Sequence, residues 1–217
     1  ACAVFYDIEN PNKFLKDISD LIDKTNGVFY LEFQDLLSII KNNLFDTICH
    51  EHLEYYSFNV IHNMLKLNNL KLIDVSKNNT NGGSLCLFIT HELSNYKVNY
   101  KSIANFTKEE KKYKLKSLST YNNFFKKIQK LKKDLTILLL KLIKNSKVVH
   151  GYGASTKGNV LLQYFNIDNK IISLIADRNP EKNNLYTPGS NIQIVNEKKS
   201  RKILPNYYLV LPWHFKN

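Results

Sequence analysis

Residues 147–158 read KVVHGYGASTKG, in which an apolar strand runs directly into a turn with two glycines one residue apart. A helix is expected at 159–165, a strand at 171–176 and a last strand at 207–211. This order predicts a mononucleotide-fold-like β-α-β unit. The end of the chain, residues 147–217, is therefore expected to form an incomplete α/β domain of its own.

A glycine turn between a strand and a helix leaves backbone N–H groups and the positive end of the helix dipole facing an anion. Lys157 adds a mobile positive charge at the same place. The turn is not a Walker A loop, and Thr156 stands where the third glycine of a GxGxxG fingerprint would fall. We therefore predict a phosphate or pyrophosphate site at Gly151, Gly153 and Lys157. A purely structural turn is the alternative.

Residues 1–100 alternate between extended and helical patterns. A short apolar run at the start resembles the end of a strand, and Asn10 and Pro11 open a helix. Further patterns predict a strand over 28–33, a helix over 58–67, and a hairpin with strands over 71–76 and 84–90. This order is typical of the C-terminal half of an α/β sheet with an antiparallel edge.

Residues 108–147 have apolar side chains every three or four positions, with lysines on the other faces and no Gly or Pro. The pattern predicts one long amphipathic helix. Residues 101–146 are accordingly expected to link two domains, 1–100 and 147–217. A coiled coil is the competing interpretation.

The formal net charge of +12 suggests an anionic partner, but only Arg178 and Arg201 are arginines. Nucleic-acid recognition depends on Arg forks and stacking aromatics, so a solvated lysine surface is favoured. The longest apolar run, 135–143, is far shorter than the ~20 residues of a membrane span. Three scattered cysteines without CxxC spacing indicate a reducing cytosol and no metal site. Both ends of the sequence look cut.

Residues 46–56 read DTICHEHLEYY, a dense group of titratable side chains in a chain with six histidines. A group that takes up a proton near neutral pH is most often a histidine tuned by a carboxylate. We therefore predict His52 as a general base that Glu51 orients or polarises. HEH lacks the helical spacing of HExxH zinc ligands. A metal site and a buried structural histidine stay as alternatives.

Six motifs, in order along the chain, resemble those of S-adenosylmethionine-dependent sugar C-methyltransferases. They are FDTICHEHL (45–53), GGSL (82–85), GYGASTKGN (151–159), DRNPEK (177–182), YTPG (186–189) and LPWHF (211–215). The resemblance implies that residues 1–100 are the C-terminal half of a class I methyltransferase domain with a Rossmann-like sheet. It implies that residues 147–217 form a second Rossmann-like α/β domain.

The resemblance also implies a zinc-binding module and a glycine-rich cofactor loop, both of which would precede Ala1. Zinc is therefore expected only in that module. Ala3 and Val4 would border S-adenosylmethionine, and the chain alone is expected to bind this cofactor poorly.

The implied reaction is methyl transfer to a carbon next to a ketone on a nucleotide-linked deoxysugar, through a base-generated enolate. His52 matches the base and Glu51 its partner, with His50 assisting. Cys49 stands where the family often has a tyrosine, and Asp7 where it often has a histidine, so the sugar or the reaction could differ. The substrate contacts expected are Gly151, Gly153, Lys157, Tyr55, Asn81 and Asp177. Asn81 lies in a predicted hairpin turn, so it contributes only if the fold brings that turn near His52.

Other functions stay open. One is a methyltransferase with an O-, N- or non-sugar acceptor, another is a non-catalytic nucleotide-binding protein, and a third is a basic RNA-binding protein. For the leading interpretation we expect a cytoplasmic enzyme with no nucleic-acid or membrane partner. The sequence leaves its oligomeric state open.

Overall fold

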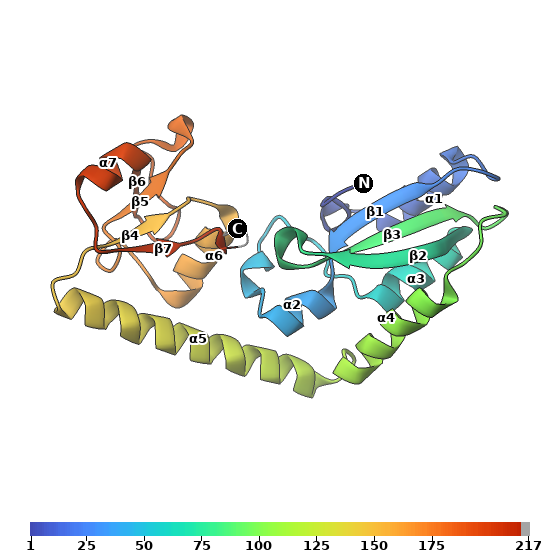
Figure 1. The fold of residues 1–217 in the computed structure, drawn as a ribbon, viewed down its shortest axis with the longest axis horizontal. Coiled ribbons are helices and arrows are strands. Elements are labelled where there is room, and N and C mark those ends of the chain that lie inside the picture. Colours follow the sequence, from blue (N-terminus) through green and yellow to red (C-terminus); the bar gives the residue numbers. More distant parts are fainter. Residues whose placement is uncertain (214–217) are drawn as a thin grey trace. The chain divides into compact units, whose positions relative to one another are not determined.

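The computed structural model describes residues 1–213 and shows a mixed α/β protein made of two units (Figure 1). The first unit holds Ala1–Phe45 and His50–Phe124. The second unit holds the short segment Asp46–Cys49 and the chain from Phe125 onward. The predicted α/β class is confirmed. His214 and Phe215, which end the sixth motif, lie outside the described residues.

The first unit is built on three strands, β1 (Phe29–Gln34), β2 (Leu70–Asn78) and β3 (Ser84–His91), in the order β1-β3-β2. β3 runs antiparallel to both neighbours, as the predicted hairpin requires. Along the other edge of β1, the segment 1–3 pairs in the parallel direction, with Ala3 N donating to Glu32 O at 2.9 Å. The chain therefore enters this sheet along a parallel edge.

Helices α1 (Pro11–Leu21), α3 (Phe58–Leu67) and α4 (Tyr100–Tyr113) contribute to a single apolar core with the sheet (Figure 1). Alternation along β1 turns Leu31 and Phe33 into this core. The helix predicted over 58–67 is confirmed at its residues. The other short elements of this unit are η1 (Phe5–Asp7), α2 (Leu36–Asn42) and η3 (Thr80–Gly82). A further short element, η2 (Phe45–Thr47), begins at Phe45 and continues into the segment Asp46–Cys49.

The prediction of a single long helix over 108–147 is wrong, because the chain forms two helices there, α4 and α5 (Leu118–Lys144). The first helix ends where Lys114 adopts a left-handed conformation with φ 49°. Thr120 Oγ1 then donates to the carbonyls of Tyr113 and Lys114, both at 3.0 Å. These side-chain hydrogen bonds satisfy carbonyls that the end of a helix leaves unpaired. The break is therefore stabilised locally.

The second unit holds a parallel sheet in the order β6-β5-β4-β7. Its elements are β4 (Val149–Tyr152), α6 (Thr156–Phe165), β5 (Leu174–Asp177), η4 (Pro180–Lys182), β6 (Gln193–Asn196), α7 (Glu197–Lys202) and β7 (Tyr207–Val210). The predicted β-α-β order is confirmed. The strand predicted from Ile171 starts at Leu174 instead, because the amides of Ile171 and Ile172 both donate to the Asp168 carbonyl in a turn.

A buried histidine lies on β4. His150 is 0% exposed, and its Nδ1 lies 2.8 Å from Ser200 Oγ, which lies 3.0 Å from the Tyr208 hydroxyl. Its Nε2 has no hydrogen-bond partner among the described residues. Burial lowers the pKa of His150 below its ordinary value, so the imidazole is neutral in the folded unit.

Acid should therefore destabilise the second unit through His150. The pKa of this group is lower in the folded than in the unfolded chain, where it is about 6.5, so its stabilising contribution is lost as the pH falls below that value. His150→Gln removes the titration while keeping a polar side chain. We expect the wild-type urea midpoint to fall more steeply than that of the variant between about pH 7 and about pH 5. Parallel profiles would contradict a neutral buried His150.

Candidate active site

The predicted base lies on a loop that is held against η1 in the first unit. Leu53 N and Glu54 N both donate to the Tyr6 carbonyl, at 2.9 and 3.1 Å. The imidazole of His52 lies against the Tyr6 ring, with centroids 4.3 Å apart, and 6.4 Å from the centroid of the Tyr55 ring. His52 is half-buried. Two phenol rings therefore contact an imidazole that solvent can still reach.

Two carboxylates accompany this imidazole. Although Asp7 is exposed, partial desolvation of its carboxylate raises its pKa, the nearby His52 lowers it and the nearby Glu51 raises it. The structure therefore brings together Asp7, Glu51 and His52, three of the residues predicted to act in catalysis. In general, a carboxylate close to an imidazole favours the protonated form of that ring.

The two residues before Glu51 lie differently. His50 is exposed on the turn, whereas Cys49 is half-buried and belongs with Asp46 to the second unit. In that unit the indole Nε1 of Trp213 donates to Asp46 Oδ2 at 2.7 Å. Two of the six motifs are thus joined by a hydrogen bond.

The glycine turn between β4 and α6 is held by side chains of its own unit. Gly153 adopts φ +83°, which favours glycine. Asp177 Oδ2 accepts a hydrogen bond from Ala154 N at 2.7 Å, and Lys182 Nζ donates to the Ala154 carbonyl at 2.6 Å. Asp177 therefore occupies an amide that an incoming phosphate would otherwise use, and its visible role is to hold the turn.

Lys157 lies in the first turn of α6 and is half-buried. Burial lowers its pKa, while electrostatic interactions with Asp46 and Cys49 in the same unit raise it. Gly151 packs against β5, and a Cβ there would lie 2.7 Å from Ile175 Cγ1. Among the residues predicted to bind phosphate, Lys157 supplies the positively charged side chain. Position 151 needs a glycine because a Cβ there would clash with Ile175.

Residues 79–217 match the family described as C-methyltransferase C-terminal domain. The chain belongs to this C-methyltransferase family. C-methyltransferase NovU from Streptomyces niveus is 29% identical to it over 211 residues, which are 97% of this chain and 50% of that protein. The C-methyltransferase chain thus spans about half the length of the curated relative that it matches. The predicted resemblance to C-methyltransferases is confirmed.

The family match begins near η3, the hairpin turn of the C-methyltransferase chain. Asn81 is left-handed there, with φ 55°, and its carbonyl accepts a hydrogen bond from Gln34 Nε2 at 2.7 Å. Gly83 has φ +133°, and a Cβ would lie 3.1 Å from Ser38 Oγ. In these contacts, Asn81 stabilises the hairpin turn.

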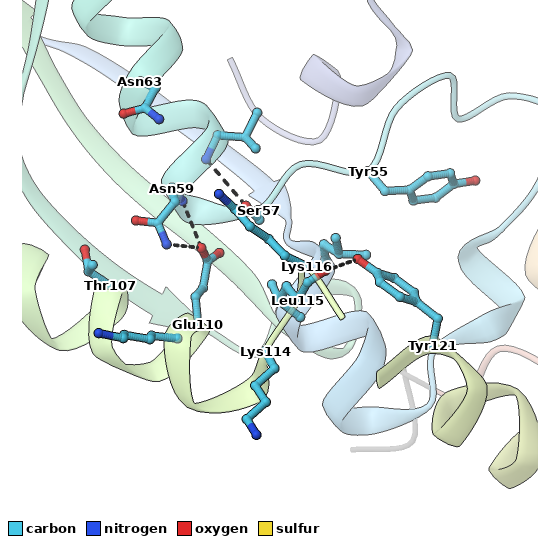
Figure 2. A pocket seen from close by; sticks show the side chains of 13 residues that line it. Tyr55, Ser57, Asn59, Asn63, Thr107, Glu110, Lys114, Leu115, Lys116 and Tyr121 are labelled. Atoms are coloured by element: carbon cyan, nitrogen blue, oxygen red, sulfur yellow. Dashed lines mark hydrogen bonds between the residues drawn. The ribbon is translucent and has the colours of Figure 1, made fainter. Parts of the chain in front are cut away.

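A cavity of about 610 Å³ lies in the first unit (Figure 2). Tyr55 lines it and also contacts His52, so one side chain borders both the cavity and the predicted base. Glu110 is buried in the wall, where it accepts hydrogen bonds from Phe58 N and, at 3.0 Å, from Asn59 N. The other lining residues are Leu36, Ser57, Val60, Asn63, Thr107, Lys111, Lys114, Leu115, Lys116 and Tyr121.

Sequence reasoning found Tyr55 but missed Glu110 and Asn59. Burial raises the pKa of Glu110, and the hydrogen bonds from Asn59 and Phe58 oppose that shift. The carboxylate also lies at the positive end of α3, where a negative charge is favourable. In the sequence, Glu110 is one more charge in a lysine-rich run, so no local signal separates it from a solvated residue.

Two further findings concern residues 1–213. No three His, Cys, Asp or Glu side chains in that part of the chain are grouped as metal ligands would be. No helix within it combines the length and the apolar character needed to cross a membrane.

Gly153→Ala should destabilise the second unit. The new Cβ would need φ +83° and would lie 2.6 Å from Pro212 Cγ and Cδ, which belong to a rigid ring. We expect a loss of about 1–3 kcal/mol in the free energy of unfolding, measured with urea. Gly189→Ala is the matched control, because it shares a positive φ but meets the flexible end of Gln163. An equal loss in both variants would contradict the close packing of Gly153 on Pro212.

Proposed function

We propose that the intact protein transfers a methyl group from S-adenosylmethionine to a carbon next to a ketone on a nucleotide-linked deoxysugar. The observation that carries the proposal is the His52 imidazole beside Asp7 and Glu51 in a chain of the C-methyltransferase family. Methylation at carbon requires a carbanion equivalent, and a base next to a ketone generates one as an enolate. His52 has the chemistry and the partners for that task.

The cofactor fits the edge of the sheet where these residues lie. In α/β proteins, nucleotide ligands bind beyond the carboxyl ends of parallel strands. The segment 1–3 is parallel to β1, and η1 with Asp7 follows its carboxyl end. Ala3 and Val4 would thus border S-adenosylmethionine, which supplies an electrophilic methyl group when bound.

The proposed part of His52 is to take the proton from the substrate carbon. The electron pair of the broken C–H bond moves toward the carbonyl, leaving an enolate with negative charge on oxygen. The proton stays on the imidazole, and the carboxylates of Asp7 and Glu51 stabilise the resulting imidazolium. The enolate carbon would then form a bond to the methyl group while the methyl–sulfur bond of S-adenosylmethionine breaks, and the electron pair of that bond would stay on sulfur in S-adenosylhomocysteine.

Two substrate contacts are proposed, each within its own unit. Tyr55 is proposed at the cavity of the first unit, and Lys157 is proposed as a phosphate contact in the second unit. Gly151 and Gly153 of the glycine turn, Asn81 and Asp177 are proposed as further substrate contacts. We further propose the domain division into residues 1–100, 101–146 and 147–217, and a cytoplasmic enzyme whose partner is a nucleotide sugar rather than a nucleic acid or a membrane.

His52→Gln should abolish the proton transfer. In the intact gene product, we expect methyl transfer and solvent deuterium exchange at the carbon next to the ketone to fall together, by about 10²–10⁴-fold, because both need the same base. Product mass spectrometry and NMR measure the two. Exchange at the wild-type rate would remove His52 from the role of base.

A second histidine serves as the control. His62 lies in α3 of the same unit and stacks on Phe58, with centroids 5.7 Å apart. His62→Gln should keep both activities close to the wild-type level. If both variants fail alike, the loss at His52 is one of folding.

A non-catalytic nucleotide-binding protein is the second candidate, favoured by the glycine turn and Lys157. Binding of thymidine diphosphate by calorimetry, with no turnover of any keto sugar, would support it. Product NMR separates methylation at carbon from methylation at oxygen or nitrogen.

A further inference from the structure

We propose that Tyr6 is a positioning residue for His52, and this inference rests on the proposed function of His52 as a base. Tyr6 contacts the His52 loop in two ways, through its ring and through its backbone carbonyl. No motif of the sequence draws attention to it. Its place directly before Asp7 is the one local hint.

The ring contact defines the orientation of the imidazole. The Tyr6 ring is 8% exposed and lies 4.3 Å from the His52 ring at an angle of 47°. The Tyr55 ring lies at an angle of 61° to the same imidazole. Aromatic rings at these separations prefer tilted and edge-to-face arrangements, so the two contacts restrict rotation of the imidazole.

The backbone contact defines the position of the loop. Residues 51–57 form neither helix nor strand, so their amides depend on contacts outside the segment. The Tyr6 carbonyl accepts the two amides that follow His52, those of Leu53 and Glu54. Both side chains are exposed, so packing does little to hold the loop here. The backbone bonds to Tyr6 therefore hold it.

Tyr6 itself is fixed by its neighbour in the chain. Phe5 is 0% exposed and contacts the rings of Phe14, Phe33 and Tyr56, at centroid distances of 5.9, 6.1 and 5.0 Å. A side chain that is locked in a close-packed core cannot shift without cost. Because the core fixes Phe5, the backbone of η1 holds the next residue, Tyr6, in place against His52.

Tyr6 also places a phenol ring against the proposed base. This ring comes from η1, on another segment of the first unit. The charged groups that face His52 are Asp7 and Glu51.

Tyr6→Leu and Tyr6→Phe in the intact gene product test the inference. Loss of the ring lets the imidazole rotate, and a misplacement of about 1 Å can cost 10²-fold in rate. We expect Tyr6→Leu to lower kcat by about 10–100-fold with KM nearly unchanged. Tyr6→Phe keeps the ring and should restore kcat to within about 3-fold of the wild type, which is roughly 0.6 kcal/mol in activation free energy.

A readout on His52 itself excludes a merely structural effect. In protein labelled at histidine, the ring protons of His52 should carry a ring-current shift that Tyr6→Phe retains and Tyr6→Leu loses. His52→Gln assigns the signal. Phe58→Leu is the matched control, because it removes a buried aromatic ring of the same unit whose ring contacts are with His62 and Phe106. It should lower the unfolding midpoint while keeping the His52 shift.

Three outcomes would overturn the inference. One is a wild-type kcat in Tyr6→Leu, another is an unchanged His52 shift in that variant, and the third is a Tyr6→Phe variant as slow as Tyr6→Leu. The last would make the hydroxyl a reacting group rather than the ring a support. If the wild-type protein methylates no keto sugar, the proposed function fails, but the His52 shift still reports whether Tyr6 holds the imidazole.

Discussion

The burial of Phe5 is the constraint on which the first unit depends. Its ring is fully buried and touches α1 through Phe14, β1 through Phe33 and the loop before α3 through Tyr56. Three segments that are distant in the sequence thus meet on one side chain. Because η1 contains both this anchor and Asp7, the core of the unit and the surroundings of His52 are fixed by the same short turn.

The glycine turn of the second unit shows a different use of charge. In many nucleotide-binding turns the helix N-terminus and free amides receive an anion of the ligand. Here the Asp177 carboxylate, held by Lys182 at 3.8 Å, takes the Ala154 amide. The chain thus supplies its own anion to the turn. A ligand phosphate would have to use other amides or the Lys157 side chain.

The sequence predicts elements well where local signals agree. The residues of α3 follow from its apolar spacing and from Ser57, whose hydroxyl caps the first turn. β6 has only four residues, and its burial is decided by pairing with β5, so its own pattern carries little information. The break between α4 and α5 depends on the Thr120 hydrogen bonds, which apolar spacing alone does not reveal.

In the candidate site, too, some residues can be recognised from local sequence signals and others only from contacts between distant segments. His52 and Glu51 stand out because titratable groups are dense in one short stretch, whereas Tyr6 and Glu110 acquire their roles only through contacts with distant segments. Asp7 became a candidate only through the resemblance to the family, and the structure places it beside His52. Composition and spacing can identify a reactive side chain, but they cannot identify the residues that orient it.

The surroundings of His52 combine a rigid frame with access to water. If His52 acts as the proposed base, a dry site between rings would retain the abstracted proton, because no acceptor could remove it. His52 is half-buried, and Asp7 and Glu51 beside it are exposed, so in the proposed reaction the proton has a path to solvent. Orientation from the core side and proton exchange on the solvent side are thus compatible in one side chain.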